Sequence, residues 1–216
     1  MIVKKLVYAY MITLLLMVSV SAPMIEAAGY TVGAKPVDPA LLASLRQGGY
    51  ILFVRHGEAT TGQDQPNLDL RDCTTQRNLS NEARRQAVLL GKAIRRLHIP
   101  VQTPIVASPF CRTRETAALA FGADNVQTDP FWVNIYNLSG NVTSDEQEST
   151  LTALRSVLEK TPAEGTNQVI IAHSFPRGLG LGEIPYLGTV VLKPKGEGHG
   201  YDIVSRISLS EWLSTQ

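Results

Sequence analysis

The sequence has few of the residues from which metal and cofactor sites are built. It contains two cysteines and four histidines, and the histidines are spread over positions 56, 98, 173 and 199. It has neither the HExxH pattern of zinc proteases nor the GxGxxG pattern of dinucleotide-binding loops. The glycine-rich stretch GLGLG, at 178–182, leads to Pro185 and not into a helix. We therefore expect no metal and no cofactor.

An excess of charge of either sign is absent as well. The chain has 20 basic and 19 acidic residues, and both counts fall to 18 when Lys4, Lys5 and Glu26 are removed with residues 1–27. Nucleic acids and anionic membrane surfaces select strongly basic proteins. We therefore expect neither of them as a partner.

The one long apolar run lies near the start of the chain, at residues 6–20. It is shorter than the ~20 apolar residues of a membrane-spanning helix. Lys4 and Lys5 precede it and small residues follow it, which is the order of a secretory signal peptide. We predict a signal peptide at 1–27, with cleavage after Ala27 favoured over an uncleaved anchor. The expected location is the bacterial periplasm or the medium, with no stable membrane association after cleavage.

The remaining residues, 28–216, are predicted to form a single domain. Strands are predicted at 50–54, 105–107, 168–172, 189–192 and 203–209. Helices are predicted at 39–46 and 111–121, from the Ser80 cap to Pro100, and from a Ser144–Gln147 capping box to residue 160. This alternation predicts an α/β fold with a mostly parallel central sheet and helices on both faces. In an exported protein the pair Cys73 and Cys111 favours a disulfide, with two free thiols as the alternative.

Reactive side chains follow three of the predicted strands. Arg55 and His56 follow the first strand, Ser108 and Arg112 the second, and His173 the third. Ligands of such sheets bind beyond the carboxyl ends of the strands, so we expect these side chains to converge. Arginines bind phosphate with two parallel donors, and a histidine nitrogen can be a nucleophile. Taken singly, each histidine could instead be structural; together they indicate a site for an anion.

The segments "RHGE", "SPFCRTRETA" and "IIAHS", in this order, resemble the histidine phosphatase superfamily, which includes the phosphoglycerate mutases and many acid phosphatases. The resemblance covers about residues 50–209. It implies a phosphoglycerate mutase-like fold and a metal-independent phosphomonoesterase for a small phosphorylated metabolite or envelope sugar phosphate. It also implies that His56 is the nucleophile that becomes phosphohistidine and that His173 is the second catalytic histidine, with Arg55 and Arg112 binding phosphate.

Several alternatives stay open at this point. A mutase-like phosphotransferase and a non-catalytic phosphate-binding module would share these motifs. Arg112 is preferred over Arg114 for the pocket, because two positions turn a helix by about 200°. Arg71 and Arg77, in the polar loop before the second helix, could extend the anion site towards the body of the substrate; the alternative is that this loop is merely solvated.

The general acid is the least determined residue. Some branches of the superfamily carry an aspartate directly after the second histidine, but Ser174 follows His173 here. Glu183 is our first choice, because it lies in the glycine-rich loop after His173 and could become partly buried if that loop folded over the pocket. The other candidates are Asp145, Glu146, Glu148 and Glu58.

Overall fold

The structure is a computed structural model, and it describes residues 34–216. The predicted signal peptide, residues 1–27, lies outside the described residues. Within the described range, no helix combines the length and the apolar character that crossing a membrane requires.

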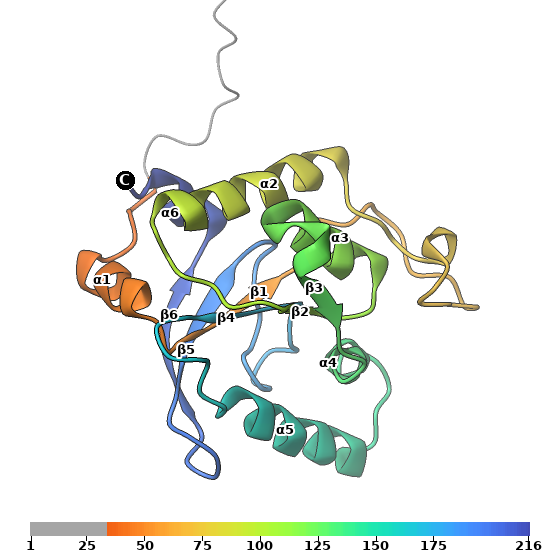
Figure 1. The fold of residues 1–216 in the computed structure, drawn as a ribbon. Coiled ribbons are helices and arrows are strands. Elements are labelled where there is room, and N and C mark those ends of the chain that lie inside the picture. Colours follow the sequence, from red (N-terminus) through yellow and green to blue (C-terminus); the bar gives the residue numbers. More distant parts are fainter. Residues whose placement is uncertain (1–33) are drawn as a thin grey trace, which may run out of the picture. The chain divides into compact units, whose positions relative to one another are not determined.

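A six-stranded sheet with the order β3-β2-β4-β1-β5-β6 forms the centre of this part of the chain (Figure 1). Its strands are β1 (Ile51–Arg55), β2 (Ile105–Ala107), β3 (Val126–Thr128), β4 (Gln168–Ala172), β5 (Thr189–Pro194) and β6 (Tyr201–Ile207). The pairs β1–β4, β4–β2 and β2–β3 are parallel, whereas β5 pairs antiparallel with both β1 and β6. The predicted α/β fold with a mostly parallel sheet is confirmed.

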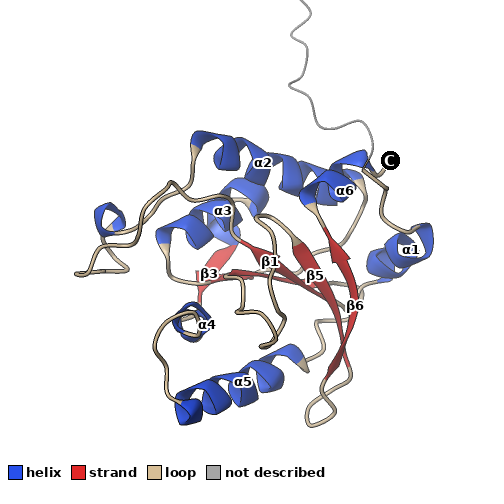
Figure 2. Cartoon of the chain, turned by 180° about the vertical axis from the view of Figure 1, so that it is seen from behind, coloured by secondary structure: helices blue, strands red, loops and turns tan. Residues whose placement is uncertain are grey.

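Helices cover both faces of the sheet (Figures 1 and 2). The helices α2 (Asn81–Arg96), α3 (Cys111–Phe121) and α6 (Leu209–Ser214) lie on one face, α4 (Trp132–Asn137) and α5 (Ser144–Leu158) lie on the other, and α1 (Pro39–Gln47) lies at the end nearer β6. Two short 3₁₀ turns, η1 (Cys73–Thr75) and η2 (Ala123–Asn125), complete the elements.

The central strand β1 explains why both faces are apolar. Leu52 and Val54 belong to the core cluster beneath α2 and α6, and Ile51 and Phe53 belong to the cluster on the α4 and α5 side. Successive side chains of a strand point to opposite faces, so a strand covered on both sides must be apolar at every position. The polar residues that follow such a strand therefore mark the place where the chain leaves the core.

Two predicted helix caps are confirmed and one is wrong. Asp38 caps α1 by accepting hydrogen bonds from the amides of Ala40 and Leu41, and Ser80 caps α2. The capping box of α5 is formed by Thr143 and Glu146, not by Ser144 and Gln147. In both pairs a hydroxyl residue stands three positions before a Glu or Gln. Only Thr143 lies outside the helix, in extended backbone, so it is the cap.

Three short elements were not predicted. The strand β3 has three residues, and α4 and α6 have six residues each, which is too short for a periodic pattern to show. The predicted strand 203–209 runs from Tyr201 to Ile207 instead, because Ser208 and Glu211 form a capping box that starts α6.

Candidate active site

The three reactive segments meet at one edge of the sheet, as predicted. The parallel strands β2, β4 and β1 are direct neighbours, so their carboxyl ends lie side by side. The rings of His56 and His173 are 5.4 Å apart between centroids, and Ser108 Oγ lies 2.9 Å from His173 Nε2. Both histidines are buried.

One hydrogen bond fixes the protonation of the His56 ring. His56 Nδ1 lies 2.6 Å from the carbonyl oxygen of Gly57. A carbonyl oxygen can only accept, so Nδ1 carries the hydrogen and donates it. Burial, and next the positive charge of Arg112, lower the pKa of His56 to about 3. The ring is therefore neutral near pH 7, and its Nε2 carries a free lone pair.

Gly57 lets this turn pack tightly against the neighbouring helices. A Cβ atom at position 57 would lie 3.1 Å from Ala83 Cβ and 3.4 Å from Leu79 Cδ2. The Gly57 amide donates a hydrogen bond to Thr116 Oγ1, at 3.1 Å. The turn that presents His56 is thus held between the start of α2 and the middle of α3, and a side chain at position 57 would push it outward.

His173 sits in an aromatic wall. Its ring centroid is 4.9 Å from that of Phe110 and 5.4 Å from that of Tyr136. Burial lowers the pKa of His173 well below its ordinary value, and the proximity of His56 and Arg112 adds to this effect. His173 is therefore neutral too, and it keeps one ring N–H to donate.

Arg112 is buried, and three of its N–H donors are used. Its side chain is 1% exposed and forms a two-bond ion pair with Asp64, with Nη1–Oδ1 at 2.9 Å and Nη2–Oδ2 at 3.2 Å. Nη1 also donates to the carbonyl oxygen of Arg77, at 3.3 Å. The preference for Arg112 over Arg114 as the pocket arginine is consistent with this buried position.

The arginines keep buried donors that remain free. Among residues 34–216, nothing accepts a hydrogen bond from the buried Nε atoms of Arg112 and Arg55. Arg55 donates through Nη1 to the carbonyl oxygen of Ile184, at 2.8 Å, and its guanidinium lies 3.8 Å above the Tyr186 ring. Each buried donor without a partner costs about 1–3 kcal/mol, which an anion between the two arginines would relieve.

The polar loop before α2 is tied to this site. Cys73 and Cys111 form the predicted disulfide. Gln76 accepts a hydrogen bond from the Cys111 amide through its side-chain oxygen, at 2.8 Å. The charge of Arg77, next in the loop, lies close enough to contribute to the lowered pKa of His56. A role for Arg77 in binding the substrate remains a prediction.

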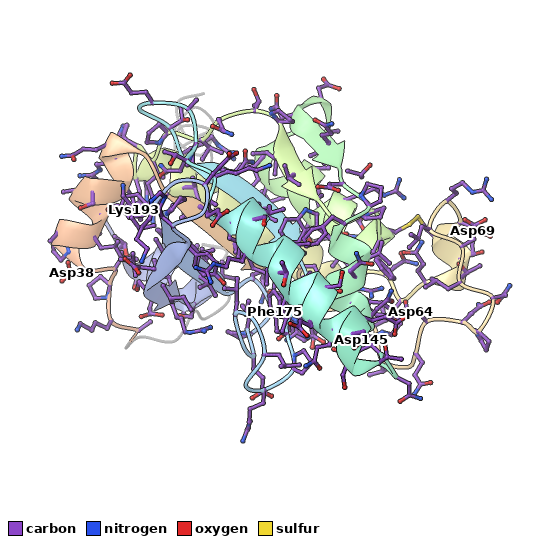
Figure 3. All side chains as sticks on the ribbon, turned by 90° about the horizontal axis from the view of Figure 1, so that it is seen from below. Asp38, Asp64, Asp69, Asp145, Phe175 and Lys193 are labelled. Carbon is purple, nitrogen blue, oxygen red and sulfur yellow. A yellow bond between two sulfur atoms is a disulfide. The ribbon has the colours of Figure 1, made fainter. Side chains whose placement is uncertain are left out.

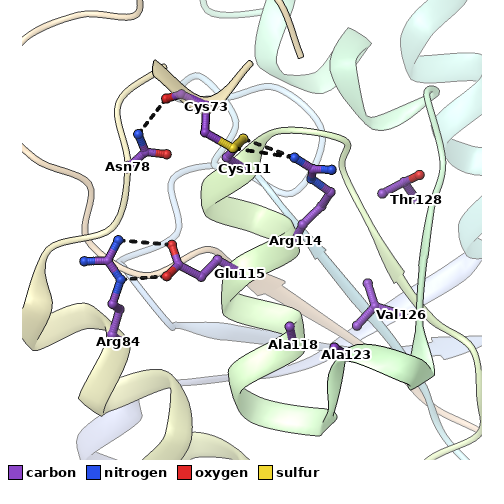
Figure 4. A pocket seen from close by; sticks show the side chains of 10 residues that line it. All are labelled: Cys73, Asn78, Arg84, Cys111, Arg114, Glu115, Ala118, Ala123, Val126 and Thr128. Atoms are coloured by element: carbon purple, nitrogen blue, oxygen red, sulfur yellow. Dashed lines mark hydrogen bonds and ion pairs between the residues drawn. A yellow bond between two sulfur atoms is a disulfide. The ribbon is translucent and has the colours of Figure 1, made fainter. Parts of the chain in front are cut away.

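Arg114 lies at a different place, beside the disulfide. It lines a cavity of about 780 Å³ together with Cys73 and Cys111, and its Nη2 lies 3.1 Å from Cys111 Sγ (Figure 4). The ion pair Arg84–Glu115 lines the same cavity. Arg112 and Arg114 of α3 therefore lie in different surroundings, as the helical angle between them predicts.

The expected general acid is not buried. The side chain of Glu183 is 63% exposed and pairs with Arg177 at 3.0 Å, so the predicted partial burial under the glycine-rich loop is not what the structure has. Glu146 is engaged in the capping box of α5. The other candidates, Asp145, Glu148 and Glu58, are exposed. Their roles stay predictions that only kinetics can separate.

Sequence reasoning missed four residues of this site: Asp64, Phe110, Tyr136 and Tyr186. Phe110 stands inside the "SPFCRTRETA" segment, so its place before α3 could have been noticed. Asp64 and Tyr186 lie in irregular loops, and Tyr136 lies in the unpredicted helix α4. These three carry no local signal that distinguishes them from solvent-facing residues.

Metal ligands do not gather in the described part of the chain: no three His, Cys, Asp or Glu side chains lie together as a metal site would need. The acid in the site, Asp64, faces Arg112 and Tyr136.

The family model described as histidine phosphatase superfamily (branch 1) matches residues 51–167. A search of curated proteins finds no match.

Among solved structures, mycobacterial hydrolase 1 is 15% identical and covers 73% of this chain and 97% of its own, with a TM-score of 0.50. The alpha-ribazole phosphatase from Shigella flexneri is 13% identical and covers 74% and 96%, with a TM-score of 0.49. A phosphoserine phosphatase from Entamoeba histolytica, in complex with 3-phosphoglyceric acid, is 15% identical and covers 76% and 98%, with a TM-score of 0.47. At these identities the likeness concerns the fold.

Proposed function

Because the chain belongs to branch 1 of the histidine phosphatase superfamily, we propose that it is a metal-independent phosphomonoesterase. Its substrate is a small phosphorylated metabolite or an envelope sugar phosphate, and its intermediate is a phosphohistidine at His56. One observation carries this proposal. The neutral His56 ring keeps a lone pair on Nε2, because Nδ1 donates to Gly57, and buried Arg112 and half-buried Arg55 each have a buried Nε donor without an acceptor.

The reaction proceeds in two displacements. His56 Nε2 attacks the phosphorus, the P–O bond to the leaving group breaks, and the leaving oxygen takes a proton. The phosphorylated ring is cationic, and the Gly57 carbonyl that accepts from Nδ1 stabilises it. Water then attacks the phosphorus, the N–P bond breaks, and inorganic phosphate leaves with His56 neutral again. Positioning and charge stabilisation by Arg55 and Arg112 supply most of the catalysis in such a transfer.

His173 and Arg77 have supporting roles in this proposal. If Ser108 donates to His173 Nε2, the hydrogen of His173 lies on Nδ1 and can be donated to a phosphoryl oxygen. A dianionic phosphate would also raise the pKa of His173 and favour its charged form. Arg77 would contact the substrate beyond the phosphoryl group.

A comparison of two histidine variants tests the nucleophile. His56→Ala should abolish hydrolysis of p-nitrophenyl phosphate, and His199→Ala, which changes an exposed histidine, should leave it intact. Wild-type protein mixed rapidly with substrate and quenched in alkali should carry one phosphoryl group that acid removes, and His56→Ala should carry none. Full activity in His56→Ala would refute the mechanism.

The same assay separates the rival functions. A phosphotransferase of the mutase type would return the phosphoryl group to an organic acceptor and release little inorganic phosphate. A binding module would bind phosphate without turnover. Release of stoichiometric inorganic phosphate over many turnovers supports the phosphatase.

Export is part of the proposal as well. The order of charged, apolar and small residues within 1–27 supports it, and the Cys73–Cys111 disulfide fits an oxidising compartment. A fusion of residues 1–33 to a reporter enzyme that works only in the periplasm should be active in a bacterial host. Deleting residues 6–20 from the fusion should abolish its activity, and a fusion that stays inactive with 6–20 present would contradict export.

A further inference from the structure

We propose that Asp64 is a positioning residue: its carboxylate holds Arg112 so that one edge of the guanidinium is free to receive two phosphoryl oxygens. This inference rests on the proposed function, because it names the residue that prepares that site for its anion. Asp64 lies in the polar loop between β1 and α2, and Arg112 lies in the first turn of α3.

The Asp64 carboxylate is saturated with hydrogen bonds. Oδ1 accepts from Arg112 Nη1 at 2.9 Å and from the Arg77 amide at 2.8 Å. Oδ2 accepts from Arg112 Nη2 at 3.2 Å and from the Tyr136 hydroxyl at 2.9 Å. An ionised carboxylate offers about four lone-pair positions, and these four donors occupy them. With a side chain only 5% exposed, Asp64 has one orientation, which three different segments determine.

This saturation argues against Asp64 as the proton donor of the reaction. Burial alone would raise the pKa of Asp64, but the hydrogen bonds from the Arg77 amide and Arg112, and the Arg112 charge, outweigh it and lower the pKa. The group is ionised near neutral pH and has no hydrogen to give. Its effect on the reaction therefore passes through the arginine that it holds.

A count of the Arg112 donors shows what is left for a ligand. The guanidinium has five N–H donors: two on Nη1, two on Nη2 and one on Nε. Nη1 uses both of its hydrogens, on Asp64 and on the Arg77 carbonyl, and Nη2 uses one on Asp64. The hydrogens on Nε and the second one on Nη2 share the remaining edge, and within residues 34–216 Nε has no acceptor. Two parallel donors on one edge are the arrangement that binds phosphate bidentately.

Aromatic rings limit how the guanidinium can rotate. Its central carbon lies 4.4 Å from the Phe110 ring centroid and 5.5 Å from that of Tyr136. The Tyr136 hydroxyl is also the fourth donor to Asp64. Tyr136 thus stabilises the carboxylate that stabilises the arginine, and it offers a variant that perturbs the position of Arg112 mildly.

A double-mutant cycle tests the inference. Asp64→Asn, Arg112→Lys and the double variant are compared in kcat/KM for p-nitrophenyl phosphate and in calorimetric binding of inorganic phosphate. Asp64→Asn alone should lower kcat/KM by about 10²-fold, the scale of one preorganised donor, and weaken phosphate binding. In the Arg112→Lys background the same change should cost less than about threefold, because lysine lacks the edge that Asp64 orients.

Asp69→Asn is the matched control. Asp69 lies in the same loop as Asp64, but its side chain is 41% exposed and pairs with Arg71, a contact of the loop with itself (Figure 3). Its replacement should leave both measurements unchanged. Tyr136→Phe keeps the ion pair and removes one hydrogen bond, so it should lower kcat/KM by about two- to tenfold. If Asp64→Asn fails to fold, Tyr136→Phe takes its place in the cycle. The loss in kcat/KM that Tyr136→Phe causes should then disappear in the Arg112→Lys background.

The outcomes separate this inference from the proposed function. Equal losses for Asp64→Asn in both backgrounds, or no loss with wild-type Arg112, would overturn the positioning role while the wild type still hydrolyses phosphate esters. A wild-type protein that binds phosphate in an Asp64-dependent way but hydrolyses no ester would refute the phosphatase and leave the positioning role intact.

Discussion

The two buried neutral histidines should make the protein lose stability in mild acid, and His56→Asn should remove a defined part of that loss. The pKa of His56 is about 3 in the folded protein, against an ordinary value of 6.5. Between these values the unfolded chain binds a proton that the folded chain does not. The stabilisation is therefore complete above pH 6.5 and is lost as the pH falls below it.

The size of the loss follows from the proton count. One proton changes the free energy of unfolding by ~1.4 kcal/mol per pH unit. From pH 8 to pH 5 the contribution of His56 is thus about 2 kcal/mol, and it hardly depends on the folded pKa as long as that value lies well below 5. His173, whose pKa is lowered in the same direction, adds to the loss in the wild type.

Urea unfolding at pH 8, 6.5 and 5 measures this effect. Asparagine at position 56 keeps an amide hydrogen near the place of Nδ1, so the bond to the Gly57 carbonyl can persist without a titrating group. Carboxylates with lowered pKa values, such as Asp64, contribute equally to the pH dependence of stability in all variants, so their contribution cancels when variants are compared. His199→Asn changes an exposed histidine and should follow the wild type. If His56→Asn loses as much stability as the wild type between pH 8 and 5, the neutral His56 ring is refuted.

Three further predictions concern the Cys73–Cys111 disulfide, Glu183 as the proton donor and the independence of the reaction from metal. Reduction of the Cys73–Cys111 disulfide, with a sequence separation of 38, should lower the free energy of unfolding by ~4 kcal/mol according to the chain-entropy relation; two freely alkylated thiols in protein from an oxidising compartment would rule the bridge out. Glu183→Gln should slow alkyl phosphates by ~10²–10⁴ and aryl phosphates much less, with Glu197→Gln as the control. Equal small effects on both esters would reject Glu183. EDTA should leave hydrolysis unchanged, and a loss of activity that added metal restores would contradict the metal-independent reaction.

The convergence of the three reactive segments was predictable, because it follows from the order of the strands alone. A buried parallel strand must be apolar, and its carboxyl end must lie beside the carboxyl ends of its neighbours. The positions of His56 and His173 after two such strands therefore bring the two histidines together before any contact is known. The distinction between Arg112 and Arg114 needed only the pitch of a helix.

The surroundings of Arg112 could not be predicted in the same way. Asp64 lies in an irregular loop and Tyr136 in a short helix, 72 positions further along the chain, and they meet through a side-chain hydrogen bond. Neither segment has a hydrophobic periodicity from which the direction of its side chains could be inferred. The buried guanidinium of Arg112 requires hydrogen-bond acceptors. Which residues supply them can be determined only from the three-dimensional structure.

The charges around His56 fit the proposed substrate. Arg55, Arg77 and Arg112 contribute three positive charges, the Asp64 carboxylate offsets one, and both histidines are neutral. The dianion of a phosphate monoester balances the two charges that remain. Without Asp64 the empty site would hold three buried or half-buried positive charges, so the carboxylate also limits the repulsion that the folded protein must carry.

The same balance excludes the Asp64 carboxylate as the source of the leaving-group proton. When the ester bond breaks, negative charge develops on the leaving oxygen, but the Asp64 carboxylate is ionised and fully engaged as an acceptor. The proton must come from water or from another acid. Glu183 directly precedes Ile184, whose carbonyl oxygen accepts a hydrogen bond from Arg55, so this exposed acid lies in a segment that contacts the site. An alkyl leaving group, which needs that proton, and an aryl leaving group, which needs it less, should therefore respond differently to Glu183→Gln.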